Sequence, residues 1–139
     1  MVDALIPRRL ASGWFIASAR NKFPLLKFSE GKAEKTPYED NIFDIVFSIN
    51  TLFYTDIEKS IPEFCRVLKN GGLGAISFDI KIFDLDNNKE FHQESLEHLR
   101  KVLKKCQAEI IFLGNEETRF DETPFKHEHT FYKIVFKKV

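Results

Sequence analysis

The chain has 139 residues, 43% of them hydrophobic and 15 of them Phe, and its 21 basic and 21 acidic side chains give zero formal net charge. This length and apolar content favour one packed domain over disorder, and the balanced charge disfavours nucleic acid as a main partner. No apolar run approaches the roughly 18 residues that a membrane span requires. Cys65 and Cys106 are isolated, so they form neither a disulfide framework nor a zinc site. Two such cysteines predict a cytoplasmic protein.

Strands and helices alternate along the first third of the chain. The apolar run Val2 to Ile6 predicts a short strand, and the spacing of apolar residues after Pro7 predicts an amphipathic helix. Gly31 and Pro37 mark a polar loop. The elements expected here are a strand over 2–6, a helix over 8–22, a strand over 25–29 and a loop over 30–41.

The central part of the chain has the strongest pattern. Residues 43–49 form a near-continuous β-rich run, which predicts a strand covered on both faces, as in a parallel sheet. Asp56 is expected to cap a helix that runs to Leu68. Asn70-Gly71-Gly72 is expected to supply the left-handed C-cap of that helix, before another apolar strand over 73–80.

The last third continues the alternation of helix and strand. The expected elements are a polar turn over 84–89, a helix over 91–105, a strand over 109–113, a polar loop over 114–129 and a strand over 131–138. The two late strands, joined by a loop, predict an antiparallel hairpin at one end of a mostly parallel sheet. The fold class is therefore α/β, with helices on both faces of the sheet.

Two segments carry a family resemblance. Residues 31–46, which end in Asn41-Ile42-Phe43-Asp44-Ile45-Val46, resemble the class I methyltransferases that act on small molecules and use S-adenosylmethionine, of the type 11 group. Residues 64–72, which read Phe-Cys-Arg-Val-Leu-Lys-Asn-Gly-Gly, resemble the helix end and glycine turn of that family. The resemblance implies an incomplete Rossmann-like methyltransferase sheet and S-adenosylmethionine as the cofactor.

The resemblance also implies the positions of site residues. In open α/β sheets ligands bind at the carboxyl ends of strands, which is where these residues are expected. The small side chain of Ala33 lets a flat base approach, and the polar Glu34 can bond its exocyclic amine. The implied cofactor residues are Asp3 as the ribose acid, Lys32, Ala33, Glu34 and Asn50, and the implied acceptor-binding residues are Thr51 and Tyr54. The alternative for Asn50, Thr51 and Tyr54 is an ordinary structural role at the end of a strand or the cap of a helix. The alternative for Asp3 is a solvent-exposed acid near the chain terminus. No catalytic residue is implied.

Part of the family pattern has no counterpart in this sequence. None of the six glycines forms a Gly-x-Gly-x-Gly cluster before residue 31. We therefore interpret residues 1–139 as a single, N-terminally truncated methyltransferase-like domain that lacks the first strand and the glycine-rich loop. Loss of a central strand leaves unpaired sheet edges. The gap can be filled by residues 2–6, or by a homodimer or partner chain that completes the sheet, or the sequence can be a fragment.

Two functions follow as hypotheses. The first is an S-adenosylmethionine-dependent methyltransferase, or a remnant of one, acting on an unidentified small-molecule acceptor. The second is a non-catalytic methyltransferase-like domain with a binding or structural role. His127 and His129 alternate on one side of an extended segment. Because no third ligand has a suggestive spacing, no metal site is expected.

Overall fold

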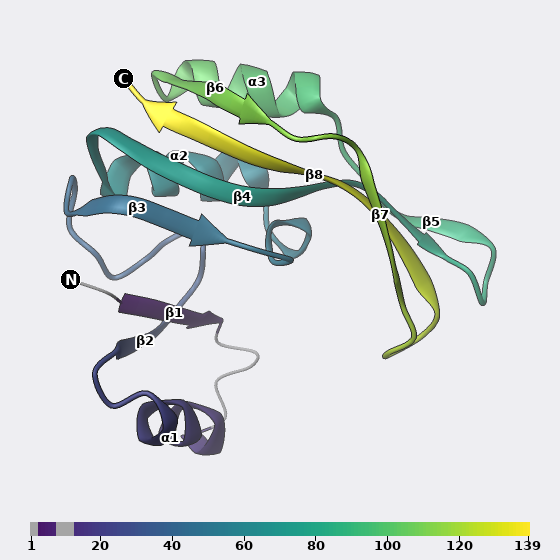
Figure 1. Cartoon of the computed structure of the whole chain (residues 1–139), viewed down its shortest axis with the longest axis horizontal. Coiled ribbons are helices and arrows are strands. Elements are labelled where there is room, and N and C mark those ends of the chain that lie inside the picture. The colour runs from purple at the N-terminus through teal and green to yellow at the C-terminus, as the bar shows by residue number, and fades with distance from the viewer. Residues whose placement is uncertain (1–2, 8–12) are drawn as a thin grey trace.

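The structure, a computed structural model, describes residues 3–7 and 13–139. Eight strands, three helices and one short 3-10 turn are found in these residues (Figure 1). In chain order they are β1 (Asp3–Pro7), α1 (Gly13–Lys22), β2 (Lys27–Gly31), β3 (Phe43–Ser48), the 3-10 turn η1 (Leu52–Tyr54), α2 (Ile57–Val67), β4 (Leu68–Asp84), β5 (Lys89–Gln93), α3 (Leu96–Lys105), β6 (Ala108–Leu113), β7 (Glu117–Asp121) and β8 (His127–Lys138).

The described strands form two separate sheets. A small parallel sheet pairs β1 with β2, and a six-stranded sheet has the order β3-β4-β8-β6, with β5 on β4 and β7 on β8. The pair β3–β4 is parallel, whereas β8 runs antiparallel to β4, β6 and β7. The α/β class and the late antiparallel hairpin are confirmed. The sheet is mixed, because β8 lies between β4 and β6 and the far ends of β4 and β8 extend into a twisted arm with β5 and β7 (Figure 1).

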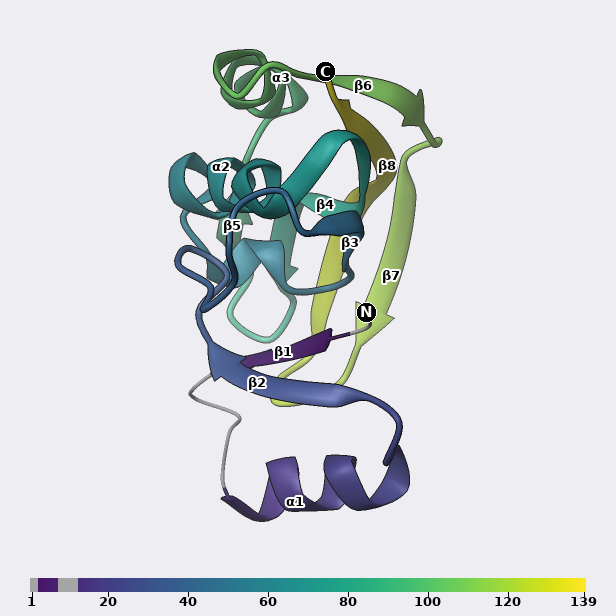
Figure 2. The ribbon, with the colours of Figure 1, turned by 90° about the vertical axis from the view of Figure 1, so that its left-hand side faces the viewer.

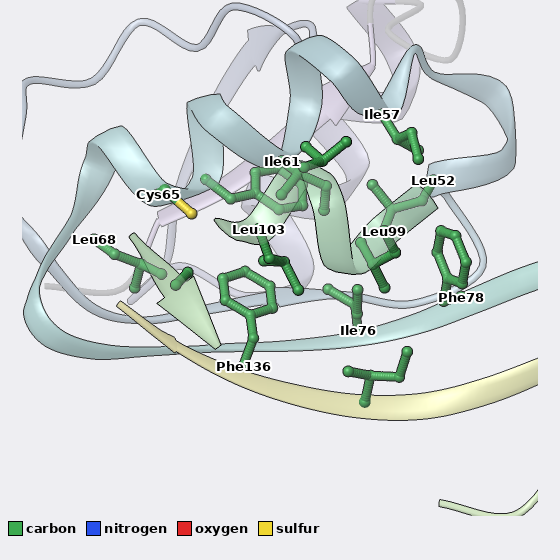
Figure 3. Close-up of a cluster of buried hydrophobic side chains, with 14 residues drawn as sticks. Leu52, Ile57, Ile61, Cys65, Leu68, Ile76, Phe78, Leu99, Leu103 and Phe136 are labelled. Carbon is green, nitrogen blue, oxygen red and sulfur yellow. The ribbon is translucent and has the colours of Figure 1, made fainter. Parts of the chain in front are cut away.

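The main core lies between the six-stranded sheet and two helices. Figure 2 shows α2 and α3 on the same side of this sheet, while α1 lies beside β2 at the other end of the molecule. Helices α2 and α3 therefore cover one face of the six-stranded sheet, and α1 packs beside the small sheet instead. Figure 3 shows the buried side chains that join helices and sheet. They include Ile61, Phe64, Leu68, Ile76, Phe78, Leu99, Leu103, Ile134 and Phe136.

Helix α2 begins as expected but ends early. Oδ1 of Asp56 accepts a hydrogen bond from the backbone N of Glu58 at 3.0 Å, which caps the first turn. The helix ends at Val67, because Leu68 is already extended and pairs with Phe43 on β3. The prediction that Asn70-Gly71-Gly72 caps the helix is therefore wrong. These residues belong to an irregularity at the start of β4, where Gly71 has a φ of +81°.

Strand β3 is open on one side. Ile45 is 60% exposed and Phe47 is 73% exposed, so the prediction of a strand covered on both faces is wrong. The reason is that Val46 faces the core under α2, while none of the described helices covers the opposite face. Among the described residues, no strand pairs with the edge of β3 that faces away from β4.

Several other boundaries differ from the sequence prediction. Of the alternatives for filling the gap, a central place for residues 2–6 is not found, since β1 (Asp3–Pro7) pairs with β2 alone among the described strands. Helix α3 begins only at Leu96, because Oγ of Ser95 accepts a hydrogen bond from the backbone N of His98 and caps it there. Strand β5 covers the end of the expected turn and the first residues of the helix expected over 91–105, and strand β7 lies within the loop expected over 114–129. The first residues of the expected helix over 8–22 lie outside the described part of the chain.

No described helix is long and apolar enough to cross a membrane.

Candidate functional site

A cavity of about 750 Å³ separates the two sheets. One wall is β1, from Asp3 to Leu5, and the other is β3 with the residues that follow it as far as Tyr54. The volume falls in the range of roughly 300–1,000 Å³ that is typical of ligand pockets. Because the cavity lies between an unpaired edge of β1 and an unpaired edge of β3, it also has the position of an additional strand. We call this cavity the strand slot.

Asn50 lies at the carboxyl end of β3, at one end of the strand slot. Its φ of +54° turns the chain out of the strand, a conformation that Asn tolerates better than most residues. Its backbone N donates a hydrogen bond to Oγ of Ser77 at 2.7 Å, and its Oδ1 accepts one from Nη1 of Arg119 at 2.6 Å. Strands β4 and β7 therefore hold Asn50 from two sides, and its side chain is oriented by a charged donor.

Thr51 and Tyr54 follow Asn50 and also line the strand slot. Oγ1 of Thr51 donates to the carbonyl oxygen of Ile49 at 2.8 Å, which tightens the turn after the strand. Tyr54 is 52% exposed, and its ring lies 4.0 Å from the ring of Phe53. The structure thus brings together the three predicted residues of this segment, Asn50, Thr51 and Tyr54, around one opening.

The predicted loop Lys32-Ala33-Glu34 follows the carboxyl end of β2 and does not line the slot. Ala33 packs against the main core, whereas Lys32 is exposed. Oε1 of Glu34 accepts a hydrogen bond from the backbone N of Asp56 at 3.2 Å. This bond places the loop beside the segment that follows Tyr54, so the two groups of predicted residues are neighbours.

Asp3 lies at the far end of β1 from this loop. In the parallel pair, Asp3 is opposite Lys27 at the start of β2, whereas Pro7 is opposite Gly31. The buried carboxylate of Asp3 accepts hydrogen bonds from the hydroxyl of Tyr38 at 2.7 Å and from Oγ of Ser29 at 3.1 Å, and Nζ of Lys27 lies 3.4 Å away. These partners give Asp3 a structural role, and its ribose role stays a prediction.

Tyr38 titrates abnormally because of this arrangement. Burial, followed by the hydrogen bond to Asp3, raises the pKa of Tyr38 to about 12. The phenol therefore stays protonated and remains a donor to Asp3 at neutral pH. The contact ties the loop before β3 to β1 across the strand slot.

Sequence reasoning missed two contributions from the arm of the sheet. Arg119, which contacts Asn50, and Asp121 both lie on β7, in the stretch that was expected to be loop. Pairing of β7 with β8 places Arg119 opposite His129 and Asp121 opposite His127. Burial alternates along Glu117–Asp121 in the structure, but the stretch is short and only Phe120 is apolar, so the sequence offered little signal of a strand.

The chain is similar to known methyltransferases in sequence. Residues 12–76 match the family described as "Methyltransferase domain". Demethylmenaquinone methyltransferase from Chlorobaculum tepidum is 37% identical over 81 residues, which are 52% of this chain and 33% of that protein. Sterol 4-C-methyltransferase of Caenorhabditis elegans is 35% identical over 74 residues, 52% of this chain and 22% of that protein. The matched part thus spans a third or less of these relatives.

The fold is similar to that of solved methyltransferase structures. A methyltransferase from Methanosarcina mazei that depends on S-adenosylmethionine superposes with a TM-score of 0.71 at 16% identity, over 99% of this chain and 82% of that one. At this identity the likeness shows the fold alone. The matching family and the two relatives identify the chain as a member of the methyltransferase family, and its fold is similar to that of an S-adenosylmethionine-dependent methyltransferase.

Proposed function

We propose that the chain forms part of a methyltransferase that transfers a methyl group from S-adenosylmethionine to a small, largely apolar molecule. The observation that carries this proposal is that Asn50 and Thr51 line the cavity at the carboxyl end of β3, while Glu34 ties the neighbouring loop to Asp56, in the segment that follows. Ligands bind at such strand ends in open α/β sheets. The printed names of two relatives, a demethylmenaquinone and a sterol methyltransferase, support an apolar acceptor.

The residues present fit one part of the cofactor. Ala33 would border the adenine ring, Glu34 would accept a hydrogen bond from its amine, and Asn50 would contact the methionine part. Thr51 and the half-exposed Tyr54 would face the acceptor. S-adenosylmethionine supplies an already activated methyl group, so the contribution of these residues is to bind and orient it.

A titration of the folded chain with S-adenosylmethionine and S-adenosylhomocysteine tests this function. We expect saturable binding of both compounds, and Asn50→Ala should weaken it by about tenfold, as loss of one polar ligand contact worth about 1.4 kcal/mol. Asn88→Ala is a matched control, because Asn88 has a φ of +52° in the turn between β4 and β5, remote from the strand slot. Absence of heat with a folded sample, or equal weakening by both variants, would contradict the proposal.

We also propose that a strand from a second copy, or from a partner chain, fills the strand slot. The unpaired edges of β1 and β3 face this cavity, and exposed backbone edges favour strand addition. The exposed side chains of Ile45, Phe47 and Ile49 offer an apolar surface to such a strand. A cytoplasmic location fits the two free cysteines, Cys65 and Cys106.

The second candidate function is that of a non-catalytic binding domain, and the strand slot favours it. A domain that binds a partner strand without the cofactor would form a complex while giving no heat with S-adenosylmethionine. The cofactor titration, performed on the chain alone and on any dimer, therefore separates the two functions.

A further inference from the structure

Three potential metal ligands converge in the arm of the six-stranded sheet. Asp121 is the last residue of β7, and it lies directly opposite His127 in the antiparallel pair of β7 with β8. His129 is two residues further along β8, so its side chain points to the same face as that of His127. One ligand atom of each residue lies within 4.8 Å of the other two.

The separations between these atoms are close to those of a metal site. Oδ2 of Asp121 lies 3.3 Å from Nε2 of His129 and 3.7 Å from Nε2 of His127. Zinc bonds of about 2.1 Å in tetrahedral geometry place ligand atoms about 3.4 Å apart. Small side-chain rotations would therefore close the three atoms around one ion.

Both imidazole rings are held in the orientation that a metal ligand needs. Nδ1 of His127 donates to the carbonyl oxygen of Phe125 at 2.7 Å, and Nδ1 of His129 donates to Oδ1 of Asp79 at 2.7 Å. Carbonyl and carboxylate oxygens only accept, so each Nδ1 carries a proton, and in the neutral imidazole Nε2 is the ring atom left to bind a metal ion. Metal-binding histidines use this outer arrangement, with a carboxylate or carbonyl behind the ring.

The cluster is more buried than is usual for titratable side chains. His129 is 1% exposed and Asp79 is 3% exposed, and Oδ2 of Asp79 has no hydrogen-bond partner among the described residues. Buried polar groups are normally satisfied, so a carboxylate placed here to orient a histidine calls for a function. The side chain of Asp121 is 35% exposed, which gives water and ions access from one side.

The carboxylate of Asp121, which faces the two imidazole nitrogens, is paired with a cation. In the described structure Arg119 supplies one, since its Nε lies 3.0 Å and its Nη2 lies 2.9 Å from Oδ2 of Asp121. A small divalent ion, by contrast, would satisfy all three ligand atoms at once.

We propose that Asp121, His127 and His129 bind a divalent transition-metal ion of the zinc class. Two imidazoles and one carboxylate suit Zn²⁺ and related ions, and three protein ligands leave at least one position for water. Binding requires Asp121 to exchange Arg119 for the metal. Because Arg119 also contacts Asn50, and the ring of Phe53 lies 5.2 Å from that of His129, the metal would lie beside the segment that carries the candidate site.

Calorimetric titration of the chelator-stripped chain with Zn²⁺ tests this site. We expect saturable binding of one ion per chain, weakened by about tenfold or more in Asp121→Asn and in His127→Gln. His98→Gln is the matched control, because His98 also contacts carboxylates, Glu58 and Glu94, but on the distant helix α3. Circular dichroism of each variant confirms that it is folded.

Cobalt substitution gives a second readout that does not depend on affinity. We expect Co²⁺ to show visible absorption typical of nitrogen and oxygen ligands, without the strong near-ultraviolet band of a cobalt–thiolate bond. No binding by the folded wild-type chain, unchanged binding in both Asp121→Asn and His127→Gln, or a thiolate band that points to Cys65 or Cys106 would overturn the proposal. These readouts are independent of S-adenosylmethionine, so failure here leaves the proposed function untouched.

Discussion

Arg66 and Glu63 form a two-point ion pair on one side of α2. Nε of Arg66 donates to Oε2 of Glu63 at 2.8 Å, and Nη2 donates to Oε1 at 2.7 Å. Thr36 donates its backbone N and its hydroxyl to the same Oε1, and Nη2 of Arg66 also reaches the carbonyl oxygen of Tyr38 at 2.8 Å. The pair therefore fastens the loop between β2 and β3, which carries Ala33 and Glu34, to the helix.

Replacing the arginine of this pair should destabilise the fold. We expect Arg66→Met to lower the free energy of unfolding by about 1–2 kcal/mol, because it removes charge-assisted hydrogen bonds and leaves Glu63 without its cation. The expected loss of stability is modest because a third of the Arg66 side chain is exposed to solvent, which screens its charge. Urea unfolding measures the change. Lys69→Met is the control, since Lys69 pairs with the highly exposed Asp44, and an equal loss in both variants would contradict the prediction.

The pH dependence of stability should report on Glu63. Hydrogen bonds from Arg66 and then from Thr36 lower the pKa of this carboxyl from 4.5 to about 2. A pKa that is lowered by folding stabilises the protein fully above the unfolded value, and this stabilisation is lost as the pH falls from 4.5 toward 2. Urea unfolding at a series of pH values should show a steeper loss in the wild type than in Glu63→Gln. The exposed Glu97, replaced in Glu97→Gln, is the control, and identical slopes for wild type and Glu63→Gln would refute the prediction.

Gly74 and Phe136 are opposite each other on β4 and β8. A Cβ atom added to Gly74 would overlap the ring of Phe136, which is fully buried. We expect Gly74→Ala to cost about 1–3 kcal/mol of stability through overpacking. The smaller side chain of Phe136→Leu should make room, so Gly74→Ala should cost less in that background. Denaturant unfolding of the four proteins measures this coupling, and strictly additive losses would show that the ring is not the obstacle.

The strand slot predicts a concentration-dependent association. If a second copy inserts a strand, the wild-type chain should dimerise in sedimentation experiments. Phe47→Lys should then shift it toward the monomer, because a charge replaces an exposed aromatic side chain that lines the slot. Phe120→Lys is the control, since Phe120 is 66% exposed on β7, outside the slot. Equal association of the wild type and Phe47→Lys would argue against a second copy in this position.

The sequence predicted those elements whose patterns are local. Strand β3 is a near-continuous β-rich run, helix α2 has strong apolar periodicity, and the cap Asp56 appears where its residue type predicts it. The end of α2 was missed because pairing of Leu68 with Phe43 outweighs the glycine signal three residues later. Strand β7 was missed because its polar sequence becomes a strand only through the long partner β8.

The candidate site was predictable to a similar extent. Asn50, Thr51 and Tyr54 could be placed because they directly follow a recognisable strand. The contact of Arg119 with Asn50 could not, since 69 residues separate them and only the twisted arm brings them together. The third metal ligand, Asp121, was hidden for the same reason: it becomes a neighbour of His127 through the pairing of β7 with β8.

Amide NMR of the folded chain during a titration with S-adenosylhomocysteine tests most directly whether the carboxyl end of β3 is a cofactor site. We expect saturable shifts at Ala33, Glu34 and Asn50, while Gly114, at the far edge of the six-stranded sheet, remains unchanged. A folded spectrum without saturable shifts, or with shifts confined to other parts of the molecule, would contradict the assignment of the carboxyl end of β3 as the S-adenosylmethionine site.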